Sequence, residues 1–192
     1  MKQSILFEWL NINPHQPSST FINPHQPSST LININIHQPS FFTRMAHFKR
    51  TASAVWQGTG AEGSGKLDGP SGVLQDTPYS ALKRFQNEDG KAGTNPEELI
   101  AAAHAGCYIM ALSFRLSGAG FTPTELRCSA TIDMDNSGGG WAFQKITLDL
   151  EASVPGLDEA QFQEHANAAK AGCPVSKALS AVPIELNAKL GF

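Results

Sequence analysis

The sequence of 192 residues predicts an α+β fold built on an antiparallel sheet. Three observations indicate this class: a helical segment with almost no charge at 99–114, two long alternating stretches at 124–135 and 143–154, and two helical segments followed by an alternating stretch at 182–190. Strands, a helix, strands, helices and a final strand in this order are typical of segregated α and β layers.

The composition excludes several classes of function. A formal net charge of -3 gives no electrostatic case for a nucleic-acid partner. We find no apolar run of the roughly 18–20 residues that a membrane span requires, so we expect no membrane partner. The run Ile5–Phe7 is too short for a secretory signal and no cleavage site follows. The odd count of three cysteines predicts free thiols in a cytoplasmic protein rather than a disulfide framework.

Residues 1–44 differ in character from the folded domain that we expect over 45–192. The segment Ile12–Thr20 returns unchanged at Ile22–Thr30, and the fragment His37–Ser40 follows. A period of ten residues is too short for a helical or propeller repeat, and the segment is rich in Pro, Asn, Ser and Gln. We therefore predict a low-complexity, disordered tail, whose histidines recur through the repeat rather than through metal binding.

The beginning of the folded domain predicts a strand and a loop region. Polar and small side chains alternate over 48–57, as in a strand. The glycine-rich loop 58–65 lacks the Gly-Lys-Ser/Thr of a phosphate-binding loop, so it indicates a turn. Residues 66–68 and 72–75 predict a short hairpin, and the polar stretch 76–93 predicts an irregular loop of the kind that carries function.

The central element is a helix that begins near Pro96. Asn95 precedes this proline, so it favours extended backbone and can cap the helix. Apolar or small side chains then occupy every face of 99–114, which predicts a helix buried all round. Gly118 and Gly120 indicate its end.

The rest of the chain predicts two strands, two helices and a strand. The strands at 124–135 and 143–154 are joined by a turn rich in Gly, and Ile, Leu and polar residues alternate in the second. Asp158 can cap a helix that extends to about residue 170, where Gly172 follows. A short helix begins at Cys173 and Pro174, and the closing strand comes last.

The three cysteines lie in different settings. Cys128 falls within a predicted strand, where a thiol is usually an inert filler. Cys173 precedes a helix, whose N-terminal N–H groups favour a thiolate. Cys107 lies in the middle of the apolar helix, where a buried thiol is inert unless a cation approaches.

Candidate cations for Cys107 lie in the loop before the helix. Lys83 and Arg84 are both there, and Glu97 at the helix start could hold a guanidinium through a bidentate pair. From spacing alone, Cys107 and Cys173 are either a redox pair or two unrelated buried thiols.

Two cysteine motifs resemble the OsmC/Ohr family, the osmotically inducible protein C and organic hydroperoxide resistance proteins. The first runs from Gly93 to Cys107 through the words NPEEL and AAAHAGC, and the second is CPVSKAL, which begins at Cys173. The sequences of both motifs are more similar to the OsmC branch than to the Ohr branch. The resemblance extends over about residues 46–190 and includes the Arg84 segment and the turn around Gly120.

The resemblance implies a thiol peroxidase that reduces organic hydroperoxides, and hydrogen peroxide less well. It assigns the attacking thiol to Cys107, which becomes a sulfenic acid, and the resolving thiol to Cys173, which forms an intramolecular disulfide. Arg84 would stabilise charge at Cys107, and Glu97 would hold Arg84. The resemblance further implies an intertwined homodimer with the sheet wrapped on long central helices, a dithiol reductant such as a lipoylated protein, and no metal or organic cofactor.

Two other hypotheses use the same residues. A non-enzymatic redox sensor or stress-response protein would oxidise the Cys107–Cys173 pair once, whereas a peroxidase consumes many equivalents of hydroperoxide. A zinc site would draw on both cysteines together with His104 and His165, since His104 lies one helical turn from Cys107.

Overall fold

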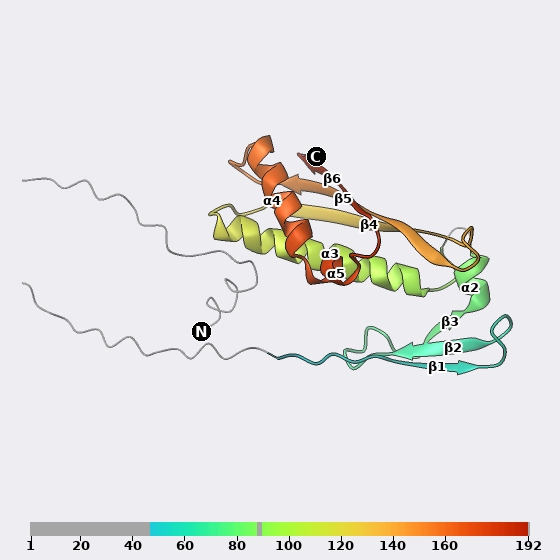
Figure 1. Cartoon of the computed structure of the whole chain (residues 1–192). Helices are drawn as coiled ribbons and strands as arrows, with labels where there is room; N and C mark the ends of the chain where they lie inside the picture. The colour runs from blue at the N-terminus through green and yellow to red at the C-terminus, as the bar shows by residue number, and fades with distance from the viewer. Residues whose placement is uncertain (1–46, 88–89, 192) are drawn as a thin grey trace, which may run out of the picture.

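The computed structural model describes residues 47–87 and 90–191. The predicted tail 1–44 and the start of the domain at 45 lie outside these residues. The described elements, shown in Figure 1, are β1 Ser53–Gln57, β2 Ser64–Asp68, β3 Thr77–Ser80, α2 Ala81–Phe85, α3 Pro96–Gly118, β4 Glu125–Asp135, β5 Ala142–Ser153, α4 Glu159–Gly172, α5 Pro174–Ala178 and β6 Ile184–Leu190.

The strands form two sheets. In the first sheet, β1, β2 and β3 are antiparallel neighbours. In the second, β4 and β5 are antiparallel, as predicted, whereas β5 and β6 are parallel, which was not predicted. The reason is the crossover between them: α4 and α5 return the chain to the end of the sheet from which β5 started.

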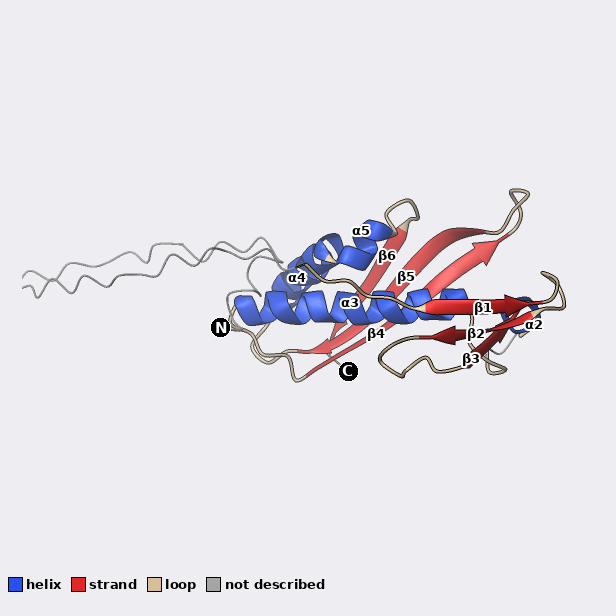
Figure 2. Cartoon of the chain, turned by 90° about the horizontal axis from the view of Figure 1, so that it is seen from below, coloured by secondary structure: helices blue, strands red, loops and turns tan. Residues whose placement is uncertain are grey.

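The core lies between the second sheet and its helices. α3 packs on β4, and α4 packs on α3 and β6, so the helices cover one face of this sheet (Figure 2). Alternate residues of β5 point into the core, as the sequence predicts. The fully buried side chains include Tyr108, Leu112, Leu116, Ile146, Leu148, Leu150 and Phe162. The α+β class is confirmed by this arrangement.

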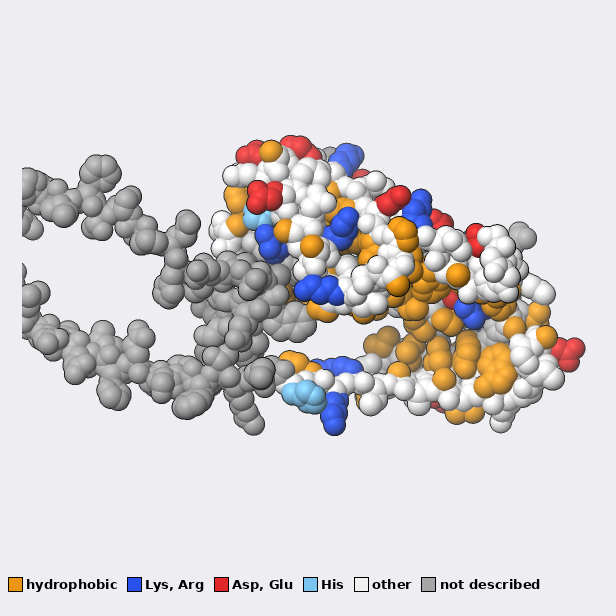
Figure 3. Space-filling view, in the orientation of Figure 1, with side chains coloured by type: hydrophobic (Ala, Val, Ile, Leu, Met, Phe, Trp, Pro, Cys, Tyr) orange, Lys and Arg blue, Asp and Glu red, His pale blue; other side chains and the backbone are white. Residues whose placement is uncertain are grey.

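The first sheet projects from this body as an arm, defined here as β1, β2 and β3. It joins the body through α2 and extends past the N-terminal end of α3 (Figures 1 and 2). The side chains of β1 are exposed along the strand, including Val55 and Trp56. In Figure 3 hydrophobic side chains line the hollow between the arm and the body.

Two local predictions in this region are wrong. The strand β2 pairs with Thr77–Ser80 instead of with the predicted 72–75, where the backbone turns and Gly69 donates to Leu74. The predicted irregular loop 76–93 also contains α2, which Ser80 caps by accepting from the Lys83 N–H at 3.2 Å. Of the strand predicted over 48–57, only the second half is a strand, β1.

The prediction that the central helix is buried all round is also wrong for a single chain. One face of α3 is buried, through residues such as Tyr108 and Leu112, but Met110 on the opposite face is 58% exposed. Residues 47–87 and 90–191 supply no second layer for that face. By length and composition alone α3 could also span a membrane, contrary to our expectation, although core helices of soluble proteins meet the same criteria.

Candidate active site

Two cysteine sulfurs meet where α5 packs against the middle of α3. Cys107 Sγ lies 3.1 Å from Cys173 Sγ, and both are free thiols. Cys173 is the N-cap residue of α5 and is fully buried, whereas Cys107 is half-buried. A disulfide bond is about 2.05 Å long, so bond formation requires an approach of only about 1 Å.

The environment of Cys107 contains opposing influences on its thiol. Burial raises the pKa of Cys107, and its contact with the Cys173 sulfur raises it further. A hydrogen bond from the backbone N–H of Val175 lowers the pKa because it stabilises the thiolate. This backbone donor was not among the sequence predictions, which considered only charged side chains. The signal was available: Val175 follows Pro174 in the first turn of α5, where N–H groups have no partner within the helix.

A second pair of side chains links the same two helices. His104 Nε2 lies 2.8 Å from Ser176 Oγ, and both residues are buried. Burial lowers the pKa of His104, so its ring is neutral at neutral pH. His104 precedes Cys107 by three residues, and Ser176 follows Cys173 by three. The hydrogen bond therefore lies one helical turn from the two sulfurs.

Arg84 and Glu97 form the predicted bidentate pair. Arg84 Nη2 lies 2.6 Å from Glu97 Oε1, and Arg84 Nε lies 3.1 Å from Glu97 Oε2. The side chains are 33% and 15% exposed, so this pair is better shielded than an ordinary surface ion pair. The Arg84 guanidinium also lies over the ring of Phe85, which stacks on Trp141 from the β4–β5 turn. These contacts hold the guanidinium at the start of α3.

The structure does not bring the two pairs together within one chain. Glu97 and Cys107 are ten residues apart on α3, which corresponds to about 15 Å along the helix axis. Because Arg84 is bound to Glu97, its guanidinium lies near that end. Among the described residues, the partners of the Cys107 sulfur are Cys173 and Val175, and neither is a cation.

The other candidate residues do not gather at the thiols. Cys128 lies on β4, where burial raises the pKa of its thiol to about 11, in keeping with an inert filler. His165 lies on α4 with its ring edge-on to Phe121. Within residues 47–87 and 90–191, no three His, Cys, Asp or Glu side chains form a metal-ligand group.

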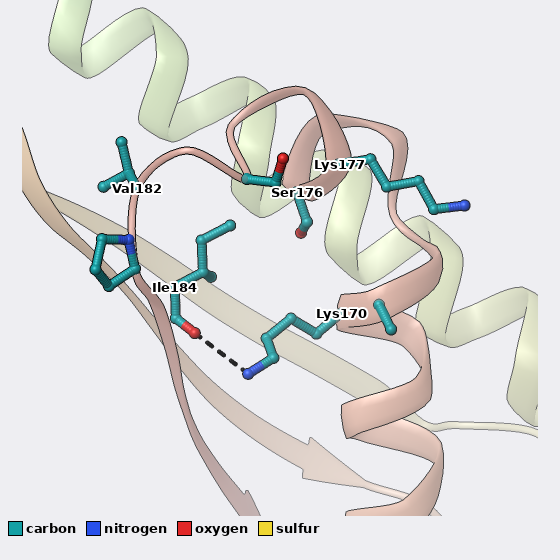
Figure 4. A pocket seen from close by; sticks show the side chains of 8 residues that line it. Lys170, Ser176, Lys177, Val182 and Ile184 are labelled. Carbon is teal, nitrogen blue, oxygen red and sulfur yellow. Dashed lines mark hydrogen bonds between the residues drawn. The ribbon is translucent and has the colours of Figure 1, made fainter.

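A pocket of about 370 Å³ opens beside α5 (Figure 4). Its wall includes Ser176, the partner of His104, and Lys170, whose Nζ donates to the carbonyl oxygen of Ile184 at 3.2 Å. This hydrogen bond links the C-terminal end of α4 to the start of β6.

Known proteins are similar in sequence to the region that contains Cys107 and Cys173. A family model described as OsmC-like protein matches residues 88–187. Peroxiredoxin OsmC of Escherichia coli (strain K12) is 46% identical over 132 residues, which cover 69% of this chain and 90% of that protein. Organic hydroperoxide resistance protein OhrB of Bacillus subtilis (strain 168) is 32% identical over 116 residues, covering 60% and 81%.

Solved structures share the fold. The crystal structure of OhrB from Bacillus subtilis aligns with a TM-score of 0.54 and 30% identity, covering 73% of this chain and 98% of that one. An OsmC-like protein from Mycoplasma pneumoniae aligns with a TM-score of 0.61 at 18% identity, covering 77% and 100%. The second likeness concerns the fold alone.

Proposed function

This chain belongs to the OsmC-like protein family, and we propose that it is a thiol-dependent peroxidase that reduces organic hydroperoxides. The relatives named above are a peroxiredoxin and an organic hydroperoxide resistance protein. The observation that carries the proposal is the 3.1 Å separation between the Cys107 and Cys173 sulfurs. Two thiols at this distance, one with a backbone N–H directed at its sulfur, can pass through a sulfenic acid to a disulfide.

The reaction takes two steps at these sulfurs. The Cys107 thiolate attacks the terminal oxygen of the hydroperoxide, the O–O bond breaks, and the alkoxide leaves and takes a proton to become an alcohol. The Cys173 thiol then attacks the Cys107 sulfenic sulfur, and water leaves as the disulfide forms. Organic hydroperoxides are the preferred substrates and hydrogen peroxide reacts less well.

The cation for the first step comes from a second copy of the chain. We assign this role to Arg84 of the partner subunit, held by the partner's Glu97. In the same chain, Arg84 is bound to Glu97, which lies about 15 Å from Cys107 along the axis of α3. The uncovered face of α3 and the apolar hollow beside the arm are two surfaces that an intertwined homodimer would bury. A guanidinium placed there stabilises the thiolate and the negative charge that develops on the peroxide oxygens.

A dithiol restores the reduced enzyme. Its first sulfur attacks the Cys107–Cys173 disulfide and its second releases the mixed disulfide, leaving two protein thiols and an oxidised reductant. We propose a lipoylated protein or another small dithiol in the cytoplasm, where thiols are kept reduced. No metal or organic cofactor takes part in these steps.

Turnover separates this proposal from a redox sensor. Purified protein is given an excess of an alkyl hydroperoxide together with dithiothreitol or dihydrolipoamide, and the hydroperoxide consumed is measured. A peroxidase consumes many equivalents per chain. Consumption of a single equivalent, with no further loss in the presence of dithiol, would instead identify a sensor that uses the same two cysteines.

A further inference from the structure

The hydrogen bond between His104 and Ser176 has no place in the chemical steps given above. Both residues are buried, and the Nε2–Oγ distance is 2.8 Å. His104 Nδ1 is also buried and has no hydrogen-bond partner among the described residues. Such a polar pair costs desolvation in a core where an apolar pair would pack equally well, so its presence calls for a reason other than packing.

The direction of this hydrogen bond follows from the burial. The neutral ring carries one proton, and a buried N–H without an acceptor is costlier than a buried ring nitrogen without a donor. The proton therefore lies on Nε2, which donates to Ser176 Oγ. A single donor aimed at a single acceptor fixes both the distance and the rotation between the two helices that carry them.

The helix α5 needs such a constraint. It has only five residues, and the side chain of its N-cap residue Cys173 makes no capping hydrogen bond. A short helix without a side-chain cap depends on its contacts with neighbouring elements for its position. Rocking of α5 would move Cys173 Sγ and the Val175 N–H together relative to Cys107.

We propose that His104 and Ser176 are positioning residues that hold α5 against α3 and so set the approach of Cys173 to Cys107. The pair acts chiefly on the second, resolving step, because the Val175 N–H that moves with α5 affects the Cys107 thiol less than burial and the Cys173 contact do. Its place in the catalytic cycle rests on the proposed peroxidase function, whereas its effect on disulfide formation is independent of any hydroperoxide.

The first test measures the disulfide equilibrium of the full chain in glutathione buffers. The Cys107 and Cys173 thiols give up two electrons and two protons, and one oxidised glutathione becomes two reduced molecules. We expect Ser176→Ala to lower the effective concentration of the thiol pair about tenfold, because one directional hydrogen bond is lost. The matched control is Ser180→Ala, which removes an exposed hydroxyl from the segment just after α5 and should leave the equilibrium within twofold of wild type.

A second set of variants separates positioning from stability. Ser176→Ala leaves the His104 N–H buried without an acceptor, whereas the double variant His104→Leu/Ser176→Ala removes both polar groups and should regain stability to urea. If the pair positions α5, the double variant remains about tenfold weaker in disulfide formation despite its restored stability. Equal recovery of stability and disulfide formation would overturn the proposal, as would a wild-type equilibrium in Ser176→Ala.

Single-turnover kinetics place the effect within the cycle. With one equivalent of hydroperoxide, Ser176→Ala should form the Cys107 sulfenic acid within twofold of the wild-type rate and convert it to disulfide about tenfold more slowly. Ser176→Thr, which keeps a hydroxyl, should restore most of the second rate. Equal slowing of both steps would contradict a positioning role in resolution. A wild-type protein that does not consume hydroperoxide would refute the peroxidase function but leave the glutathione result to decide this inference.

Discussion

The thiol pair and the guanidinium pair are built in different ways. Cys107 and Cys173 meet inside one chain, between two packed helices, with their sulfurs 3.1 Å apart. Arg84 of α2 and Glu97 of the first turn of α3 meet at the N-terminal end of α3, partly exposed. Each pair is geometrically complete by itself, yet about 15 Å of helix separates them. One chain therefore contains both thiols of the disulfide, but it places the charge that we assign to the attack on hydroperoxide elsewhere.

The largest effect should come from the attacking thiol. Cys107→Ser removes the sulfur that carries the oxidation, so we expect hydroperoxide turnover to disappear completely. The control Cys128→Ser changes a half-buried thiol on β4 and should keep most of the activity. Turnover is followed as hydroperoxide consumed in the presence of dithiol. Retained activity in Cys107→Ser would remove the thiol pair from the mechanism.

A charge on the uncovered face of α3 should separate the two pairs. Met110→Glu places a carboxylate on the face that we assign to the second copy, where burial of an unpaired charge is costly. We expect a monomer in analytical ultracentrifugation, loss of most peroxidase activity, and a glutathione-driven Cys107–Cys173 disulfide that still forms. Gln161→Glu, on the exposed side of α4, is the matched control and should remain dimeric and active. A fully active monomer would show that no second copy is needed.

Removal of the guanidinium should cost less than removal of the thiol. Arg84→Met loses a preorganised charge, for which kcat/KM falls by about 10²–10³-fold in comparable sites. Glu97→Gln keeps a polar partner for Arg84 and should cost about tenfold. Arg127→Met breaks another bidentate Arg–Glu pair, which lies exposed on β4, and should change kcat/KM less than about twofold. Equal losses for Arg84→Met and Arg127→Met would deny Arg84 a special role.

The backbone N–H of Val175 should have the smallest effect. Val175→Pro removes this donor in the first turn of α5, where proline is tolerated. Loss of a hydrogen bond to the thiolate raises the pKa of Cys107, so less thiolate exists at pH 7 and the reactivity curve moves to higher pH. Alkylation by iodoacetamide as a function of pH measures this shift. Val175→Ala keeps the N–H, so a similar shift in that variant would mean that packing, not the N–H, is responsible.

Local chemistry could be predicted from the sequence where it is encoded locally. Asn95 and Asp158 cap their helices as expected, accepting from the N–H groups of Glu98 and Gln161 at 2.8 and 2.9 Å. The pairing of Arg84 with Glu97 was also predicted, because a cation just before a helix start lies within reach of a carboxylate in its first turn. The parallel pairing of β6 was not, since alternation along a strand says nothing about the direction of its neighbour.

The interactions that the sequence did not predict depend on how separate elements pack. Pro174 indicates a first helical turn in which the Val175 N–H is free, but only the packing of α5 on α3 directs this N–H at Cys107. His104 and Ser176 stand beside the two cysteines in the sequence, but their contact exists only once α5 lies on α3. Within one chain Glu97 holds Arg84 away from Cys107, so a contact between Arg84 and Cys107 stays a prediction about a homodimer.

Subunit complementation tests the central claim most directly. The Cys107→Ser and Arg84→Met chains, each inactive or nearly so, are mixed in equal amounts, unfolded and refolded together. In a mixed dimer, one site combines an intact Cys107 with an intact Arg84 of the partner subunit. With random pairing in a twofold dimer, half of the dimers are mixed and each has one working site, so about a quarter of wild-type activity should return. If the mixture shows no more activity than its two separate components, Arg84 does not act across the subunit boundary.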